Sequence, residues 1–283
     1  MRESDRMVCG PPSRGYESFY REFDSPLMRV LRREAYGEDI GQHSWVTAEE
    51  LRQDIVRLKL SSSSRFLDLG CGPCGPLTFI LRSVGCRGCG ADVSDFALAA
   101  GRARAAALGV EASISLHRLD LDEILPFADR SFDAVMALDV VLHLRDRAKL
   151  FREVARILAP FGRFLLTDAG VVTGSLSEQD MRRRSAQGHT QLVLPGFNET
   201  ELENAGFQML ETEDRTSSVL HNSTGRLAAS LAHQSELEKL WGMQEFERQR
   251  VYLETVVELS RRRALSRIMF LAELRSHHPG AER

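Results

Sequence analysis

The chain alternates short apolar runs with stretches in which apolar residues recur every three or four positions. Runs typical of buried strands lie at 65–69, 86–92, 114–119, 131–138 and 163–167. The helix expected between the first two runs has its apolar face at Leu77, Ile80, Leu81 and Val84. Strand, helix and strand repeated in this way predict an α/β fold with a parallel, doubly wound sheet and helices on both faces.

Polar residues with short side chains mark where several helices begin. Thr47, with Glu50 three positions later, forms a capping box. We predict that Ser94, Asp146 and Asn198 cap three further helices, because their side chains accept hydrogen bonds from free backbone N–H groups. Beyond residue 172 the pattern loosens into a polar stretch at 175–189, a strand at 207–211, a helical tract at about 225–263 and a last strand at 268–272.

Composition and charge narrow the functional class. The chain has a net charge of −3 and its arginines are mixed with glutamates, so we expect no nucleic-acid partner. For the triplet Arg182-Arg183-Arg184 we favour a solvated helix face over a site for an acidic substrate, since charge runs are usually solvated. The N-terminal M-R-E-S-D-R lacks the apolar stretch of a secretion signal, and no run of about 18 apolar residues predicts a membrane span. We therefore expect a soluble, cytoplasmic protein without a membrane partner.

The segment R-F-L-D-L-G-C-G-P-C-G at 65–75 carries the clearest chemistry. It reads as a buried strand, a tight turn with Gly70, Gly72 and Gly75 in G-x-G-x-x-G spacing, and the start of a helix. Asp92 ends the next strand, 22 positions after Gly70, where an acid accepts hydrogen bonds from the hydroxyls of a ribose. The segment therefore predicts an adenosine-containing cofactor.

Asp68, two positions before Gly70, distinguishes between the possible cofactors. A carboxylate beside a diphosphate is disfavoured by like-charge repulsion, whereas a ligand with an ammonium and a sulfonium is attracted to it. The acid therefore favours S-adenosylmethionine over a nicotinamide or flavin dinucleotide.

Four of the cysteines have the Cys71-x-x-Cys74 and Cys86-x-x-Cys89 spacing of zinc ribbons. Cys71, however, lies between two glycines of the turn, and Cys86 and Cys89 are predicted on opposite faces of a strand. A tetrahedral metal needs all four thiolates to converge. We therefore predict buried, unreactive thiols and no metal site.

The motif D-L-G-C-G-P-C-G at 68–75, followed by G-A-D at 90–92, resembles motif I and the acidic loop of class I S-adenosylmethionine-dependent methyltransferases. The resemblance implies a Rossmann-like, seven-stranded, mostly parallel sheet in the order 3-2-1-4-5-7-6. It also implies S-adenosyl-L-methionine as the cofactor, bound by Asp68, Gly70, Cys71, Gly72, Gly75, Asp92, Val93, Asp139 and Val140. In this family an acid after the third strand meets the adenine, which here implies Asp120 with the backbone of Leu121, and Asp122 is an alternative to Asp120.

The stretch Tyr16–Trp45, which contains G-E-D-I at 37–40, resembles the N-terminal lid of small-molecule methyltransferases similar to sarcosine/dimethylglycine and sugar methyltransferases. The alternative is an amphipathic helix that packs on the core. The resemblance implies that the lid closes over the methionine end of the cofactor. By this resemblance, Gln42, His43 and Ser44 reach the carboxylate of the cofactor. Tyr20 and Trp45 shield its sulfonium.

His143 and Asp168 are the candidates for a general base, because both follow strands at the edge where ligands bind. By resemblance, His143 stands at the second histidine of the L-H-H-M-P-D loop of sugar O-methyltransferases, with Leu142 at the first. Asp168 stands at the acid after their fifth strand. Catechol-type enzymes hold Mg²⁺ with carboxylates after the fourth and fifth strands, at the positions of Asp139 and Asp168. They also have an asparagine where this chain has Ala169, so a ligand is missing and we predict no metal.

These observations predict four parts: a flexible leader at 1–15, a helical lid at 16–64, an S-adenosylmethionine-binding core at 65–172, and substrate-covering helices with the last two strands at 173–283. The predicted activity is methyl transfer to the oxygen or nitrogen of a small molecule, such as a secondary metabolite, by a monomer or homodimer. The alternatives are an NAD(P)-dependent oxidoreductase, a C-methyltransferase and a non-catalytic S-adenosylmethionine-binding protein.

Overall fold

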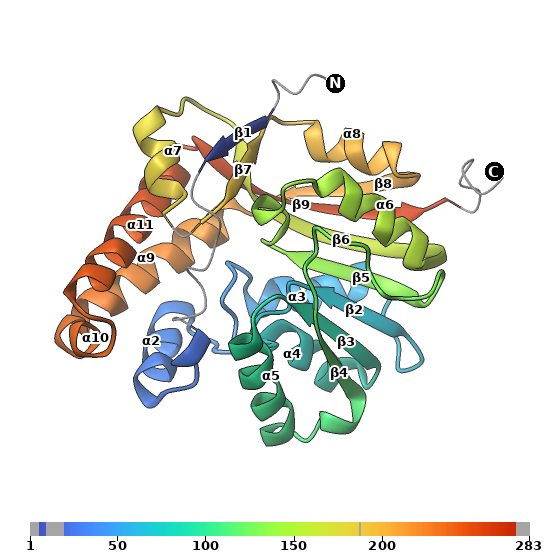
Figure 1. Ribbon diagram of the computed structural model, residues 1–283, viewed down its shortest axis with the longest axis horizontal. Helices are drawn as coiled ribbons and strands as arrows, with labels where there is room; N and C mark the ends of the chain where they lie inside the picture. Colours follow the sequence, from blue (N-terminus) through green and yellow to red (C-terminus); the bar gives the residue numbers. More distant parts are fainter. Residues whose placement is uncertain (1–5, 10–19, 187, 276–283) are drawn as a thin grey trace.

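The strands form a single sheet in the computed structural model, which describes residues 6–9, 20–186 and 188–275 (Figure 1). The parallel part of the sheet consists, in spatial order, of β4 (Ile114–Arg118), β3 (Arg87–Asp92), β2 (Arg65–Leu69), β5 (Phe132–Leu138) and β6 (Leu158–Val172). Beside β6 lie β9 (Leu265–Leu274) and then β8 (Phe207–Asp214), each antiparallel to its neighbour. The predicted order 3-2-1-4-5-7-6 is therefore confirmed.

Two short strands that the sequence pattern did not predict extend this sheet. β7 (Thr190–Val193) pairs in parallel with β6 at Val171, and β1 (Arg6–Cys9) pairs antiparallel with β7. Arg6–Cys9 belongs to the predicted flexible leader, so that prediction is wrong for this segment; 1–5 and 10–15 lie outside the described residues. Such short strands form only through pairing with a distant partner, which local periodicity does not reveal.

Alternation along the central strands places an apolar core on each face of the sheet. Phe66 and Met136 face one side and pack with helix α4 (Gly75–Val84). Leu67 and Val135 face the other side and pack with helix α6 (Arg147–Ile157). Because both faces are covered, the central parallel strands are apolar almost throughout, which explains why they were predictable.

Helices cover both faces of the sheet (Figure 1). On the face of α4 lie α3 (Ala48–Arg57) and α5 (Asp95–Ala107), and on the face of α6 lies α8 (Phe197–Asn204). The capping box of Thr47 and the caps by Ser94 and Asp146 are confirmed. The predicted cap by Asn198 is wrong, because α8 begins directly after Gly196 and Asn198 is a buried residue of its first turn.

The predicted helical tract at 225–263 consists of three helices and begins earlier. They are α9 (Thr216–Ala232), α10 (Gln234–Trp241) and α11 (Met243–Arg261). Together with α2 (Pro26–Tyr36) and α7 (Glu178–Arg184), they gather beyond the carboxyl ends of the parallel strands, at the left of Figure 1. Helix α9 packs on α2 and α11, and α11 also packs on α7. We call these five helices the helical cover.

No helix within the described residues, 6–9, 20–186 and 188–275, is both long and apolar enough to span a membrane.

Candidate active site

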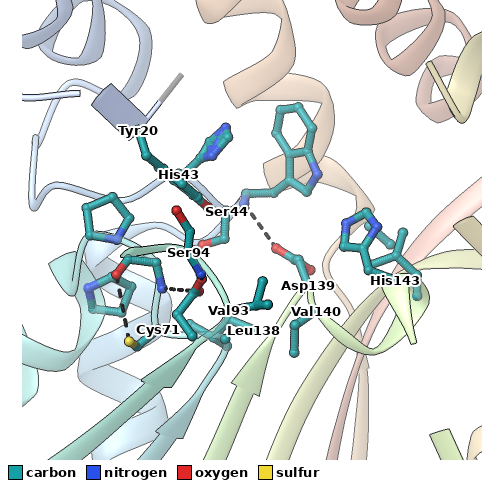
Figure 2. Close-up of a pocket in the computed structure, with 18 of the residues that line it drawn as sticks. Tyr20, His43, Ser44, Cys71, Val93, Ser94, Leu138, Asp139, Val140 and His143 are labelled. Carbon is teal, nitrogen blue, oxygen red and sulfur yellow. Dashed lines mark hydrogen bonds between the residues drawn. The ribbon is translucent and has the colours of Figure 1, made fainter. Parts of the chain in front are cut away.

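A cavity of about 570 Å³ lies at the carboxyl ends of the parallel strands (Figure 2). The glycine turn after β2, the loop after β3 and the segment after β5 form one side of its wall. The loop at 37–47 between α2 and α3, which we call the lid loop, also contributes to the wall. Helices α7, α9 and α11 of the helical cover contribute the opposite side. Ligands bind at this edge in open parallel sheets.

Most of the predicted cofactor residues line this cavity. They are Tyr20, His43, Ser44, Trp45, Asp68, Gly70, Cys71, Gly72, Asp92, Val93, Asp139 and Val140. In Figure 2, residues of the lid loop lie across the cavity from the strand ends that carry Cys71, Val93 and Val140. The structure therefore brings together segments that are far apart in the chain.

The glycine turn has the backbone geometry that its sequence predicts. Gly70 has a φ of +70°, and a Cβ atom there would lie 2.5 Å from Val140, so a side chain is excluded for two reasons. The N–H of Gly72 donates to the Asp92 carboxylate at 2.9 Å, which ties the turn to the end of β3. Gly75 was predicted to contact the cofactor, but it does not line the cavity. A Cβ there would lie 2.1 Å from the carbonyl oxygen of Gly41, so Gly75 instead permits the lid loop to approach.

Asp68 and Asp92 bring two carboxyl groups into the cavity wall, and both are buried. Burial raises the pKa of Asp68 well above its ordinary value, and the neighbouring Asp92 raises it further. Burial also raises the pKa of Asp92, although the N–H groups of Ser94 and Gly72 donate hydrogen bonds to its carboxylate. Two buried acids suit a ligand that offers hydroxyl donors and positive charge. S-adenosylmethionine has both, whereas a diphosphate adds like charge.

The loop before α3 is fastened to the sheet through Asp139. The backbone N–H of Trp45 donates to one carboxylate oxygen of Asp139 at 3.0 Å. The other oxygen accepts hydrogen bonds from the Thr167 hydroxyl and from Arg267 Nε, both at 2.8 Å. Asp139 therefore positions the lid loop and has both oxygens engaged. Within the described residues, no group of three or more histidine, cysteine, aspartate or glutamate side chains is placed to hold a metal ion.

Of the five residues predicted to contact the cofactor from the lid, all except Gln42 line the cavity. Tyr20 and His43 pack edge to face, with ring centroids 5.3 Å apart, and burial lowers the pKa of His43 well below its usual value. Gln42 was predicted to reach the cofactor but lies away from the cavity. Its side chain accepts from the N–H of Ile40 and donates to the carbonyl of Glu38, so it holds the loop together.

His143 lies in the short 3-10 helix η3 (Val141–His143) and lines the cavity, as predicted. Its Nδ1 lies 3.0 Å from the carbonyl oxygen of His189. A carbonyl only accepts, so Nδ1 carries the proton and Nε2 holds the lone pair of the neutral ring. Burial lowers the pKa of His143 to about 4, against the opposing effect of this hydrogen bond. The ring is therefore neutral at physiological pH, the state that a base requires.

Asp168, the second predicted base, is not on the cavity wall. β6 continues to Val172 instead of ending at Thr167, so Asp168 lies within the strand and Ala169 faces the cavity. The Asp168 carboxylate is fully buried, pairs with Arg147 Nη1 at 2.5 Å, and accepts from the Asn198 amide at 2.9 Å. Asp168 is therefore part of a structural ion pair, and the buried Asn198 belongs to the same network.

The residues predicted at the adenine do not line the cavity either. Asp120 is exposed, and Leu121 is buried in the apolar core. The alternative, Asp122, accepts hydrogen bonds from the N–H groups of Arg145 and Asp146, which ties its loop to the start of α6. Arg118 at the end of β4, and Val93 and Ser94 after β3, line the cavity.

The helical cover adds residues that the sequence pattern did not identify. Arg184, Arg226, Gln249 and Tyr252 line the cavity from α7, α9 and α11. The only signal for these residues in the sequence is the triplet that contains Arg184, for which the charge pattern predicts a solvated helix face. That interpretation holds for Arg182 and Arg183, which are exposed, but is wrong for Arg184, which is 4% exposed.

The four cysteines with zinc-ribbon spacing, Cys71, Cys74, Cys86 and Cys89, form no disulfide and are buried. Cys86 and Cys89 belong to the cores on opposite faces of the sheet, as predicted. The Sγ atoms of Cys71 and Cys74 lie 3.7 Å apart at the glycine turn. Their mutual hydrogen bond and burial raise the pKa of Cys71 well above its ordinary value, which disfavours the reactive thiolate.

Residues 67–166 match the family described as the methyltransferase domain. Among curated proteins, the chain is 38% identical over 122 residues to methyltransferase GfsG of Streptomyces halstedii, and the aligned residues cover 43% of each protein. It is 31% identical over 178 residues to the glycine/sarcosine/dimethylglycine N-methyltransferase of Actinopolyspora halophila. That alignment covers 62% of this chain and 31% of that protein. The chain thus spans less than half the length of these two relatives.

A solved structure gives a similarity of fold over most of the chain. Phosphoethanolamine N-methyltransferase 2 of Haemonchus contortus, in complex with phosphomonomethylethanolamine and S-adenosylhomocysteine, superposes with a TM-score of 0.76. The superposition covers 93% of this chain and 60% of that chain at 20% identity. At this identity the comparison shows the Rossmann-like methyltransferase fold and nothing finer.

Proposed function

Because the chain belongs to the class I S-adenosylmethionine-dependent methyltransferases, we propose that it transfers a methyl group to an oxygen or nitrogen of a small molecule. One observation carries this proposal: the acidic glycine turn and a neutral histidine line the same cavity. The turn supplies the cofactor site, and His143 supplies a proton acceptor in the same cavity.

The residues around the turn would hold the cofactor, which supplies a methyl group made electrophilic by its sulfonium. Asp92 is placed to accept hydrogen bonds from ribose hydroxyls, and Asp68 to attract the positive charge. His43 and Ser44 face the cavity from the lid loop, where they would meet the carboxylate. Tyr20 and Trp45 would exclude water from the sulfonium, because both aromatic residues line the cavity.

His143 would act as the general base. An oxygen or nitrogen acceptor loses a proton as it gains the methyl group, and this proton would pass to Nε2 of His143. The hydrogen bond from Nδ1 to the carbonyl of His189 fixes the tautomer that makes Nε2 the acceptor. Positioning would supply a further part of the rate enhancement, since holding two reactants in line can lower the activation free energy by ~7 to 11 kcal/mol.

The names of the relatives agree with this proposal at the level of reaction type. Of the two curated relatives described above, one is named as an N-methyltransferase and one only as a methyltransferase. An acceptor oxygen or nitrogen, action as a monomer or homodimer, and a cytoplasmic location remain predictions. A C-methyltransferase is kept as the alternative, because a carbon acceptor in an activated position would use the same cavity and the same base.

Calorimetry and a turnover assay test the proposal in sequence. We expect the purified chain to bind S-adenosylmethionine and S-adenosylhomocysteine, and not NAD. We then expect formation of S-adenosylhomocysteine when a panel of small hydroxyl, amine and carbon acceptors is added. Binding of NAD in place of both sulfur compounds would contradict the proposal. Binding without turnover across the panel would favour a non-catalytic protein.

A further inference from the structure

A buried arginine of the helical cover faces the candidate base. Arg184, the last residue of α7, lines the cavity and is 4% exposed. It lies near enough to His143 that its charge lowers the pKa of that histidine. A second arginine of the cover, Arg226, lies toward the lid loop, over the ring of Trp45 at 5.0 Å.

The interactions of Arg184 differ from those of the other buried arginines in the part of the chain that the structure describes. Each of the others pairs with at least one carboxylate: Arg32 with Asp24 and Asp39, Arg147 with Asp168, Arg215 with Asp54, and Arg267 with Glu50 and Asp139. No carboxylate among the described residues pairs with Arg184. Its guanidinium lies over the ring of Tyr252 at 5.5 Å and donates to the Tyr252 hydroxyl at 3.3 Å.

Burying a guanidinium without a carboxylate partner costs folding free energy, because the charge loses hydration and no opposite charge compensates for it. One neutral hydroxyl satisfies only one of its five N–H donors. The remaining donors form a planar fork, whose geometry matches the two oxygens of a carboxylate or a phosphate. Because Arg184 faces the cavity, a bound ligand is the group that can supply those oxygens.

We propose that the methyl acceptor carries an anionic oxygen group, a carboxylate or a phosphate, that binds to Arg184 beside the hydroxyl of Tyr252. This inference rests on the proposed function, since it assigns a substrate class to the same cavity. The anionic group anchors the acceptor at the α7 and α11 side, with its nucleophilic atom directed toward His143. The cofactor's own carboxylate would lie at the lid loop, on the side of Arg226 and His43, which also line the cavity.

Anion binding to the chain saturated with S-adenosylhomocysteine tests this proposal. Melting temperatures are measured in sodium phosphate and in sodium acetate against sodium chloride of equal ionic strength, for the wild type and for Arg184→Gln. We expect phosphate or acetate to stabilise the wild type beyond chloride, and this stabilisation to be lost in Arg184→Gln. Stabilisation by phosphate alone assigns a phosphate ester, and stabilisation by acetate alone assigns a carboxylic acid.

Two further variants make the comparison specific. Arg183→Gln removes the same charge from the exposed neighbour and should leave the anion effect unchanged. Arg184→Lys keeps the charge but not the fork, so we expect part of the effect to return, and it replaces Arg184→Gln if that variant fails to fold. With an acid and its neutral amide as paired acceptors, Arg184→Gln should raise KM for the acid by about 10- to 100-fold and spare the amide.

Three results would overturn the inference. The first is no anion stabilisation of the wild type, and the second is equal stabilisation of the wild type and Arg184→Gln. The third is a loss of S-adenosylhomocysteine affinity in Arg184→Gln as large as the loss of anion binding, which would assign Arg184 to the cofactor carboxylate. Failure of the wild type to bind S-adenosylhomocysteine at all is a separate result, and it contradicts the proposed function instead.

Discussion

The two sides of the cavity carry opposite charge and are built in different ways. On the sheet side, Asp68 lies in β2 and Asp92 ends β3, and the backbone N–H groups of Gly72 and Ser94 donate to the Asp92 carboxylate. On the cover side, Arg184 and Arg226 come from helices and lie over the rings of Tyr252 and Trp45. The sheet side is organised by backbone geometry, whereas the cover side depends on how helices far apart in the chain pack.

This difference has a consequence for specificity. A turn held by its own backbone accommodates the constant ligand, which every member of a family shares. Side chains on packed helices can change without disturbing the sheet, so the variable ligand is expected to contact them. If the two sides act separately, a substitution on one side should leave the binding of the other side's ligand unchanged.

The largest effect is expected for His143→Ala. Loss of a general base typically lowers turnover by about 10²- to 10⁴-fold, while cofactor affinity should stay near that of the wild type. Steady-state kinetics and calorimetry with S-adenosylhomocysteine measure the two quantities. His221→Ala, which removes an exposed histidine of α9, is the matched control. Near-normal turnover in His143→Ala would show that another group takes the proton or that none needs to.

Asp68→Asn should weaken the sheet side alone. A hydrogen bond to a charged group contributes ~1.5–3 kcal/mol, so we expect the Kd for S-adenosylmethionine to rise about 10- to 100-fold. Because burial raises the pKa of Asp68, the wild type should lose affinity as pH falls through that raised pKa, at a higher pH than an ordinary aspartate would. Asp68→Asn should not show this dependence.

Asp120→Asn is the control for Asp68→Asn, since Asp120 is exposed and away from the cavity. We expect its Kd for S-adenosylmethionine to equal that of the wild type. A weakening comparable to that of Asp68→Asn would restore Asp120 to the cofactor site.

Folding stability should report the buried, neutral state of His143. Its pKa is about 4 in the folded chain and near 6.5 when unfolded, so between these values the unfolded chain binds a proton that the folded chain does not. Stability from this group is present above pH ~6.5 and is lost as pH falls toward 4, by up to about 1.4 kcal/mol per pH unit. The stability difference between the wild type and His143→Gln, measured by urea unfolding, should shrink over that interval. A constant difference would mean that His143 titrates normally.

The smallest effect is expected for Tyr252→Phe on the cover side. It removes the hydroxyl that Arg184 contacts but keeps the ring beneath the guanidinium. A neutral hydrogen bond contributes ~0.5–1.5 kcal/mol, so the KM for an acidic acceptor should rise about 2- to 10-fold. The Kd for S-adenosylmethionine should not change, and a change in it would mean that the two sides of the cavity are coupled.

Much of the sheet was predictable, because buried parallel strands are apolar almost throughout and their helices carry capping signals at Thr47, Ser94 and Asp146. The turn at Gly70 and the acids Asp68 and Asp92 were predictable too, since their roles depend on residues a few positions away or on the end of the next strand. His143 was found because it follows β5 at the edge where ligands bind.

Only the tertiary structure decided which side chains face the cavity where the chain leaves regular spacing. Asp168 lies at the predicted edge, but the longer β6 turns it toward Arg147 and presents Ala169 instead. Arg184 and Arg183 are neighbours of the same type, yet packing of α7 against α11 buries one and leaves the other in water. Local patterns specify elements through short-range hydrogen bonds and burial, whereas the direction of a side chain at the end of an element depends on partners far away in sequence.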